Sequence, residues 1–212
     1  MQNIPMFTSE FGVASLILKE IPYSGTAYIR IQSSLSVDTL LEECVSFCRV
    51  VGAERIYATG HDDLGKFPIH TKVLQMEIIG EDLPCGNDEL VPVVEENLEE
   101  WQRIYNEKMS GVDNASYMTL REVKQMVQKR QGWFVVAGGE VVAIAMAEPG
   151  KLHAVASVLP GGGRIALSVL RKILGDGPVS LEVASTNTRA IRLYEDLGFQ
   201  QTEELSCWYK II

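Results

Sequence analysis

Short apolar runs alternate with helical patterns through the second part of the sequence, and this order restricts the chain to few folds. Two runs at residues 133–137 and 140–147 flank Gly138 and Gly139, which predicts a β-hairpin. Further strands are predicted at residues 152–158, 179–184 and 203–211. Strands alternating with helices indicate an α/β (α+β) fold, a mixed sheet with helices packed on it.

Helices are expected before the hairpin and between the later strands. The four helical patterns cover residues 93–109, 119–130, 161–174 and 188–197. Thr119 and Glu122 have the spacing of a capping box at the start of the second pattern.

The first part of the chain carries a smaller set of elements. Strands are predicted at residues 12–21, 26–32, 55–59 and 73–79, with one helix at residues 37–51. Ser36 is the predicted N-cap of that helix and Gly52 its stop. Residues 80–88 are polar and rich in turn formers, so we place a linker there. Two domains follow, residues 1–85 and residues 90–212.

Composition excludes several classes of function. The formal net charge is -9, which argues against nucleic acid as the main partner and is compatible with a cationic substrate. The spacing of the 4 cysteines does not form a zinc-binding cluster, so no metal is expected. We read no membrane span and no signal peptide, and we expect a cytoplasmic protein.

The stretch at residues 185–199, STNTRAIRLYEDLGF, has readable physical chemistry. Asn187 follows a strand and can cap the next helix, while its amide can bond a ligand at the strand end. Ala190 is small enough to let a ligand pass close to the helix. Tyr194 lies about two turns after Asn187 on the side facing the sheet. Gly198 and Phe199 suit the helix end.

This stretch resembles the C-terminal motif of the GNAT (N-acetyltransferase) superfamily, and the element order from residue 90 onward is similar to that family. The resemblance implies a mixed central sheet with flanking helices, acetyl-CoA as co-substrate and transfer of the acetyl group to an amine. It assigns Asn187 and Ala190 to coenzyme binding. It assigns Tyr194 the role of general acid for the leaving thiolate.

The resemblance also implies a glycine turn that binds pyrophosphate through the amides of a helix start. The segment VLPGGGRIA departs from the family pattern, because Gly161 and Arg164 stand where Arg or Gln and a glycine are usual. The turn after Pro160 is also about two residues short of the family pattern. The expected coenzyme contacts on this turn are Gly161, Gly162, Gly163, Arg164 and Ala166. Arg164 could add a cation, or the turn could be an eroded one that binds nothing.

In the family, the strand before this turn leaves its neighbour and pairs with the pantetheine arm. The resemblance therefore assigns the backbone of Ala156, Ser157 and Val158 to the acyl and pantetheine groups. The general base stays unassigned, with Glu148, His153 and Glu182 as the nearby titratable residues.

The first domain parallels the second in its element order, which favours a degenerate half-copy of the same fold. Residues 26–32, 37–51 and 55–59 match residues 153–158, the helix from Arg164, and residues 179–184. An unrelated small α/β domain is the alternative. We expect no coenzyme contacts from residues 1–81, since no glycine turn precedes this helix. The His61-Asp62-Asp63 loop is read as an ordinary polar loop or as part of an amine-binding surface.

Two functions remain open from the sequence. The first is an N-acyltransferase in which the amine of a small molecule or peptide attacks the thioester directly. The second is a non-catalytic acyl-CoA-binding or sensor module with an eroded phosphate turn. A ligand-free scaffold is a third, more distant reading. Neither the amine nor a homodimeric state is fixed by the sequence.

Overall fold

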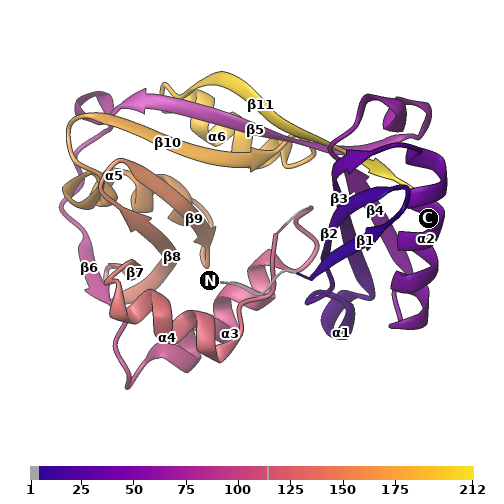
Figure 1. The fold of residues 1–212 in the computed structure, drawn as a ribbon. Coiled ribbons are helices and arrows are strands. Elements are labelled where there is room, and N and C mark those ends of the chain that lie inside the picture. The colour runs from indigo at the N-terminus through magenta and orange to yellow at the C-terminus, as the bar shows by residue number, and fades with distance from the viewer. Residues whose placement is uncertain (1–4, 114) are drawn as a thin grey trace. The chain divides into compact units, whose positions relative to one another are not determined.

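The computed structural model describes residues 5–113 and 115–212, and the chain divides into two compact units. Unit 1 contains Met1–Val73 and Glu204–Ile212, and unit 2 contains Leu74–Glu203. These bounds differ from the sequence boundary near residues 85–90. Strands β5 (Ile69–Ile79) and β11 (Gln200–Lys210) each begin in one unit and end in the other (Figure 1).

Unit 1 is a sheet with one long helix. Its elements are β1 (Met6–Ser9), β2 (Gly12–Ile17), α1 (Ile21–Ser24), β3 (Thr26–Ser34), α2 (Val37–Val50) and β4 (Arg55–Thr59), followed by the 3-10 turn Asp62–Lys66. The strand order is β1-β2-β3-β4-β11, in which β3 and β4 are parallel. This parallel β-α-β arrangement confirms the strand-helix-strand order predicted from the sequence.

The apolar face of α2 is the core of unit 1. Leu40, Cys44 and Cys48 are completely buried with Ile29 and Ile56 of the sheet. Burial raises the pKa of the Cys44 thiol to about 12 and that of Cys48 to about 11. The two cysteines therefore act as small apolar core residues.

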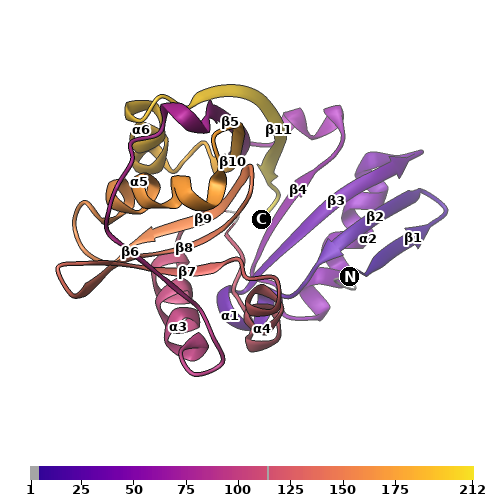
Figure 2. The same cartoon turned by 90° about the vertical axis from the view of Figure 1, so that its left-hand side faces the viewer.

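Unit 2 is a mixed sheet with helices on both faces. Its further elements are the 3-10 turn Gly80–Asp82, β6 (Glu89–Pro92), α3 (Leu98–Met109), α4 (Leu120–Gln128), β7 (Gly132–Ala137), β8 (Glu140–Glu148), β9 (Lys151–Ser157), α5 (Gly162–Leu174), β10 (Pro178–Ala184) and α6 (Thr188–Asp196). The strand order is β5-β10-β9-β8-β7-β6. Figure 2 shows α5 and α6 on one face of β7–β9 and α3 with α4 on the other.

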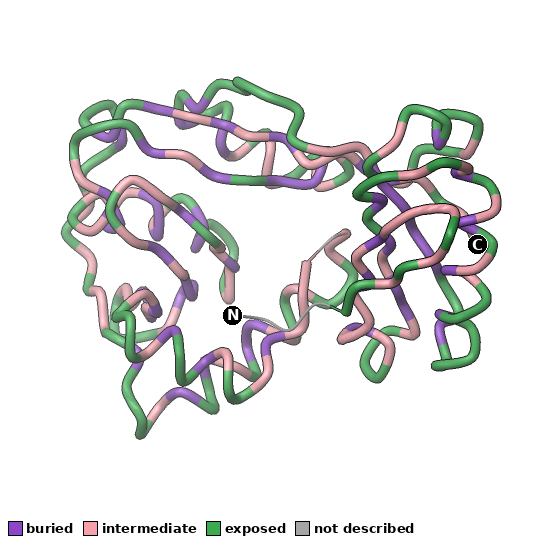
Figure 3. Tube along the Cα trace, viewed as in Figure 1, coloured by how far each residue is buried: buried purple, intermediate pink, exposed green. Residues whose placement is uncertain are grey.

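Each face of this sheet has its own core. Leu167 and Leu170 of α5 pack with Leu181 and Phe199 on one face. Trp101 of α3 packs with Val123 of α4, Phe134 and Ile144 on the other. Buried and more exposed residues alternate along several strands (Figure 3), as expected where successive side chains point to opposite faces.

One sequence prediction fails in the segment before α3. The predicted linker, residues 80–88, is followed by a strand, β6, and the helix begins at Leu98 rather than at residue 93. The amide of Val93 donates to the carbonyl of Gly132 at 3.0 Å, and the amide of Val94 donates to Asn97 Oδ1 at 2.8 Å. These bonds hold the segment in a turn, and Pro92 is tolerated because β6 lies at the sheet edge.

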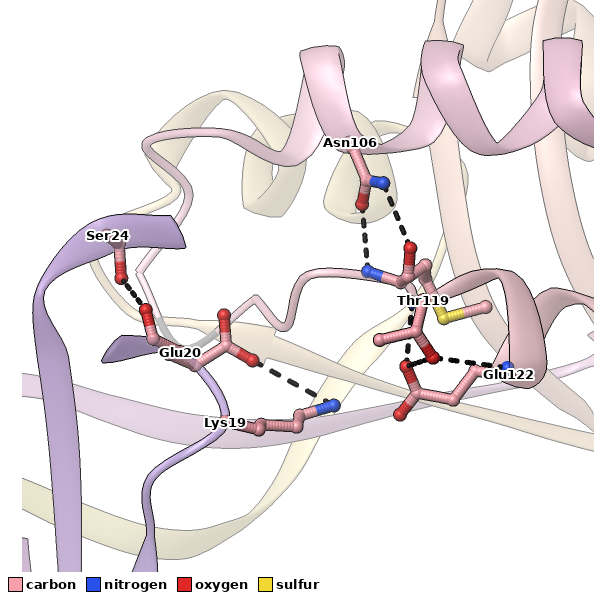
Figure 4. A network of polar contacts seen from close by, with 7 residues as sticks. Lys19, Glu20, Ser24, Asn106, Thr119 and Glu122 are labelled. Atoms are coloured by element: carbon pink, nitrogen blue, oxygen red, sulfur yellow. Dashed lines mark hydrogen bonds and ion pairs between the residues drawn. The ribbon is translucent and has the colours of Figure 1, made fainter. Parts of the chain in front are cut away.

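The predicted capping box of α4 is present. Thr119 Oγ1 accepts from the amide of Glu122, and Glu122 Oε2 accepts from the amide of Thr119 (Figure 4). Asn106 of α3 exchanges two hydrogen bonds with the backbone of Met118, at 2.8 and 3.0 Å. The start of α4 is therefore fixed to the end of α3. Figure 4 also shows Lys19, Glu20 and Ser24 of unit 1, where the hydroxyl of Ser24 donates to the carbonyl of Glu20.

Candidate coenzyme site

Strands β9 and β10 separate early. They pair in parallel through two residue pairs, Ser180 with Lys151 and Leu181 with Leu152, and then run apart (Figure 1). From His153 onward, β9 lies beyond this pairing and keeps β8 as its partner on the other side. Backbone groups on the β10 side of β9 are consequently in a position to pair with an extended ligand.

The residues that face this gap follow from the β8–β9 ladder. The amide of Val158 donates to the carbonyl of Val142 at 2.9 Å, so it is not turned toward β10. In an antiparallel pair, backbone groups alternate between the partner strand and the other edge. Val155 and Ser157 therefore present their backbone groups to the gap, whereas Ala156 and Val158 face β8. The resemblance assigned Ala156, Ser157 and Val158 to the pantetheine arm, and of these Ser157 presents its backbone groups to the gap.

The glycine turn begins α5 at the end of β9, as predicted. Gly161 is the N-cap with φ of 81°, a left-handed conformation that favours glycine. Gly162 is required by close packing, because a Cβ at this position would lie 1.9 Å from the carbonyl oxygen of Val142. Ala166 is completely buried and packs in the core, so its side chain belongs to the helix-sheet contact rather than to a ligand surface.

The amides of this turn already have partners within the chain. The amide of Gly162 donates to the carbonyl of Leu159 at 3.0 Å, and that of Arg164 donates to the carbonyl of Gly161 at 3.0 Å. Gly163 donates to the hydroxyl of Ser157 at 2.8 Å. An anion at this helix start must compete with these bonds, and Ser157 is the one side chain among them. Sequence reasoning missed this role of Ser157.

Arg164 is turned toward the neighbouring helix. Its guanidinium lies 3.1 Å from Asp196 Oδ2 of α6, and the two side chains are 53% and 65% exposed. An exposed ion pair of this kind contributes about 0–1 kcal/mol. It therefore offers little resistance to a competing phosphate.

Helix α6 begins as the sequence predicts. Asn187 is its N-cap, and Asn187 Oδ1 accepts from the amide of Ala190 at 3.2 Å. The side-chain amide nitrogen is then the group that Asn187 can offer to a ligand. A Cβ added to Gly163 would lie 3.0 Å from Leu193 of α6, so the start of α5 lies close to the second half of α6.

Tyr194 lies on the buried side of α6. Its side chain packs in the core with Phe199, with ring centroids 5.6 Å apart. Burial raises the pKa of Tyr194 to about 12, so the phenol is protonated throughout the physiological range. The Tyr194 side chain is thus a proton-bearing group at neutral pH.

The three titratable residues left open by the sequence fall into two groups. His153 Nε2 lies 2.8 Å from Glu148 Oε1, and Gln131 donates to the other oxygen of Glu148 at 2.6 Å. Glu182 instead pairs with Lys151 at 2.9 Å.

Among the residues that the structure describes, no group of three or more His, Cys, Asp or Glu could hold a metal ion, and no helix there could span a membrane.

Solved structures of acetyltransferases share this fold. No protein-family model matches the sequence, and no curated protein matches it at a significant level. A GCN5-related N-acetyltransferase from Anabaena variabilis superposes with a TM-score of 0.62 at 8% identity, covering 93% of this chain and 59% of that one. A putative acetyltransferase from Pyrococcus horikoshii gives 0.59 at 16% identity, covering 94% and 68%.

The similarity extends beyond the second part of the chain. A GCN5-related N-acetyltransferase from Sphaerobacter thermophilus covers 94% of this chain and 76% of its own, with a TM-score of 0.56 at 16% identity. The sequence resemblance began only at residue 90, because unit 1 lacks the family's motifs. The chain has the fold of the GCN5-related N-acetyltransferases across both of its units.

Proposed function

We propose that this chain is an acyltransferase that moves the acetyl group of acetyl-CoA to an amine. The observation that carries the proposal is the geometry of β9. It leaves β10 after two residue pairs and ends at the glycine start of α5. A single strand thereby connects an open backbone edge to a helix N-terminus, the two features that an extended arm ending in pyrophosphate needs.

In this proposal the coenzyme binds along β9 and the start of α5. The pantetheine arm pairs with the backbone of Val155 and Ser157 along the open edge of β9. The pyrophosphate accepts from the amides of Gly162, Gly163 and Arg164 at the start of α5. The amide nitrogen of Asn187 supplies a further donor.

The internal bond of the turn at Gly163 is a weak competitor for this ligand. The hydroxyl of Ser157 is a neutral acceptor for the amide of Gly163. Hydrogen bonds to a charged acceptor are roughly twice as strong as neutral ones. Exchange of the hydroxyl for a pyrophosphate oxygen is therefore favourable once Ser157 rotates away.

Transfer requires the amine nitrogen to attack the thioester carbon and the sulfur to leave. In our proposal the hydroxyl of Tyr194 donates a hydrogen bond to the departing thiolate. Burial raises its pKa to about 12, which is above the value of about 8.5 for an ordinary thiol. Tyr194 therefore stabilises the thiolate as a donor, and full proton transfer is completed with solvent.

A non-catalytic acyl-CoA-binding module is the second candidate. The observation in its favour is that the amides at Gly162, Gly163 and Arg164 have acceptors within the chain. A protein of this kind would hold the coenzyme through the backbone of β9 without turning it over.

One experiment separates the two functions. The full chain is incubated with acetyl-CoA and a panel of amines that includes diamines, amino acids and peptides with free amino termini. The release of free thiol is recorded, and the acetylated product is identified by mass spectrometry. Amine-dependent formation of both supports the transferase. Calorimetric binding of acetyl-CoA with no product from any amine supports the binding module, and no binding at all contradicts both.

A further inference from the structure

His153 lies at the point where β9 and β10 part, and it has no role in the function proposed so far. It is the first residue of β9 beyond the pairing with β10. It is also the extra residue of a β-bulge, since Met146 pairs with Ala154 and Ala147 pairs with Leu152. Bulges redirect a side chain at sites next to ligands.

We infer that His153 is the general base that takes the proton of the attacking amine, and that Glu148 and Gln131 position it. This assignment rests on the proposed transferase function. His153 lies four residues before Ser157, or about 13 Å along the strand from the residue that contacts the glycine turn. A coenzyme with its pyrophosphate at that turn extends toward His153 with its thioester end.

The hydrogen bonds select the nitrogen that acts. Glu148 Oε1 lies 2.8 Å from His153 Nε2, and Gln131 holds Glu148 Oε2 at 2.6 Å. The hydrogen bond from His153 lowers the pKa of Glu148, with Gln131 as the second cause, so Glu148 is a carboxylate at neutral pH. A carboxylate can only accept, which places the proton on Nε2 and leaves the lone pair on Nδ1 for the amine.

The step balances with these groups alone. The amine nitrogen forms a bond to the thioester carbon, the carbon–sulfur bond breaks, and the amine proton moves to His153 Nδ1. The thiolate is protonated with the help of Tyr194, and His153 returns its proton to solvent. The net change is one acetyl group moved from sulfur to nitrogen and one proton moved from nitrogen to sulfur.

The neighbouring charges do not compete for this role. Lys151 and Glu182 pair with each other at 2.9 Å, so Glu182 has a cationic partner. Lys129 also acts on Glu148 and lowers its pKa further.

The test uses His153→Gln, Glu148→Gln and Glu182→Gln in the full chain, with the best amine from the panel. We expect His153→Gln to lower kcat/KM at neutral pH by about 10²–10⁴-fold while acetyl-CoA affinity and melting temperature stay at the parent values. Its remaining rate should rise with pH toward the pKa of the amine, whereas the parent rate reaches a plateau.

Glu148→Gln should lower kcat about tenfold while KM for the amine and acetyl-CoA affinity stay near the parent values, because the imidazole loses the acceptor that orients it. Glu148→Asp should restore part of the rate, whereas a purely structural role for Glu148 would change the melting temperature and leave kcat unchanged. Glu182→Gln should keep the parent rate.

The outcomes distinguish a wrong assignment of His153 as the base from a wrong proposal of acetyltransferase activity. A parent protein that transfers no acetyl group overturns both. An active parent with a His153→Gln variant within threefold of it overturns only the assignment of the base. A loss confined to Glu182→Gln would transfer the role to that carboxylate.

Discussion

At the scale of single residues, burial determines what the groups of the site can do. Tyr194 was predicted as the acid because of its position after Asn187, and the structure buries its ring beside Phe199. Its raised pKa keeps the proton in place. Ser157 was predicted for its backbone alone, yet its hydroxyl holds the amide of Gly163. Sequence gives residue type and spacing, while such a contact depends on the path of β9 into the turn.

Tyr194→Phe tests the acid role by removing only the hydroxyl. Turnover should fall about a hundredfold, with coenzyme affinity nearly unchanged because the ring still packs. Steady-state kinetics and calorimetry measure the two effects. Tyr23→Phe serves as a control, since Tyr23 is 51% exposed. Turnover within threefold of the parent contradicts the role of Tyr194, and a collapse of coenzyme binding would make the hydroxyl a binding group.

Ser157→Ala tests whether the amide of Gly163 receives the pyrophosphate. Removing the hydroxyl frees this donor, so acetyl-CoA should bind a few-fold more tightly by calorimetry. Ser168→Ala is the matched control, because the Ser168 hydroxyl donates to the carbonyl of Ile165 within the same helix. Weaker binding in Ser157→Ala would mean that the hydroxyl itself contacts the ligand.

At the scale of helices and strands, prediction was accurate where the signal is local. The hairpin at Gly138 and Gly139 forms with positive φ at both residues, and the caps at Thr119 and Asn187 are present. The short edge strands β1 and β6 were missed, because a four-residue strand is defined by its partner rather than by its own pattern.

The two side-chain caps allow stability to be separated from binding. Asn187→Ala and Thr119→Ala should each lower the free energy of unfolding by about 0.5–2 kcal/mol. Only Asn187→Ala should also weaken the binding of acetyl-CoA, since Thr119 caps a helix on the opposite face of the sheet. Chemical denaturation and calorimetry report the two quantities. Equal coenzyme affinity in both variants would remove Asn187 from the site.

At the scale of the whole molecule, one unit is built from two segments that are far apart in the sequence. The last residues, Glu204–Ile212, belong to the same unit as Met1–Val73. Tyr209 pairs with Ala58, and Lys210 pairs with Tyr57. Such pairing between distant segments leaves no trace in local composition, so the sequence divides the chain at a polar linker instead. The position of the glycine turn was predictable because it is fixed by neighbours in sequence.

The burial of unit 1 predicts the reactivity of the thiols. With pKa values of about 12 and 11, Cys44 and Cys48 are roughly 10⁻⁴ and 10⁻³ thiolate at pH 8. A thiol reagent should therefore modify the exposed Cys85 in the native protein, and Cys44 with Cys48 only after unfolding. Mass spectrometry of the labelled peptides measures this. Rapid native labelling of Cys44 or Cys48 would contradict the described packing of α2.

The crystal structure of the full chain with acetyl-CoA is the most direct test of the central claim. We expect the pyrophosphate within hydrogen-bonding distance of the amides of Gly162–Arg164, with the hydroxyl of Ser157 displaced. The pantetheine arm should lie along β9 on the side of β10, paired with Val155 and Ser157, and the thioester should lie beside His153. Coenzyme bound to residues of unit 1, or a coenzyme in unit 2 that touches neither β9 nor the start of α5, would contradict the account.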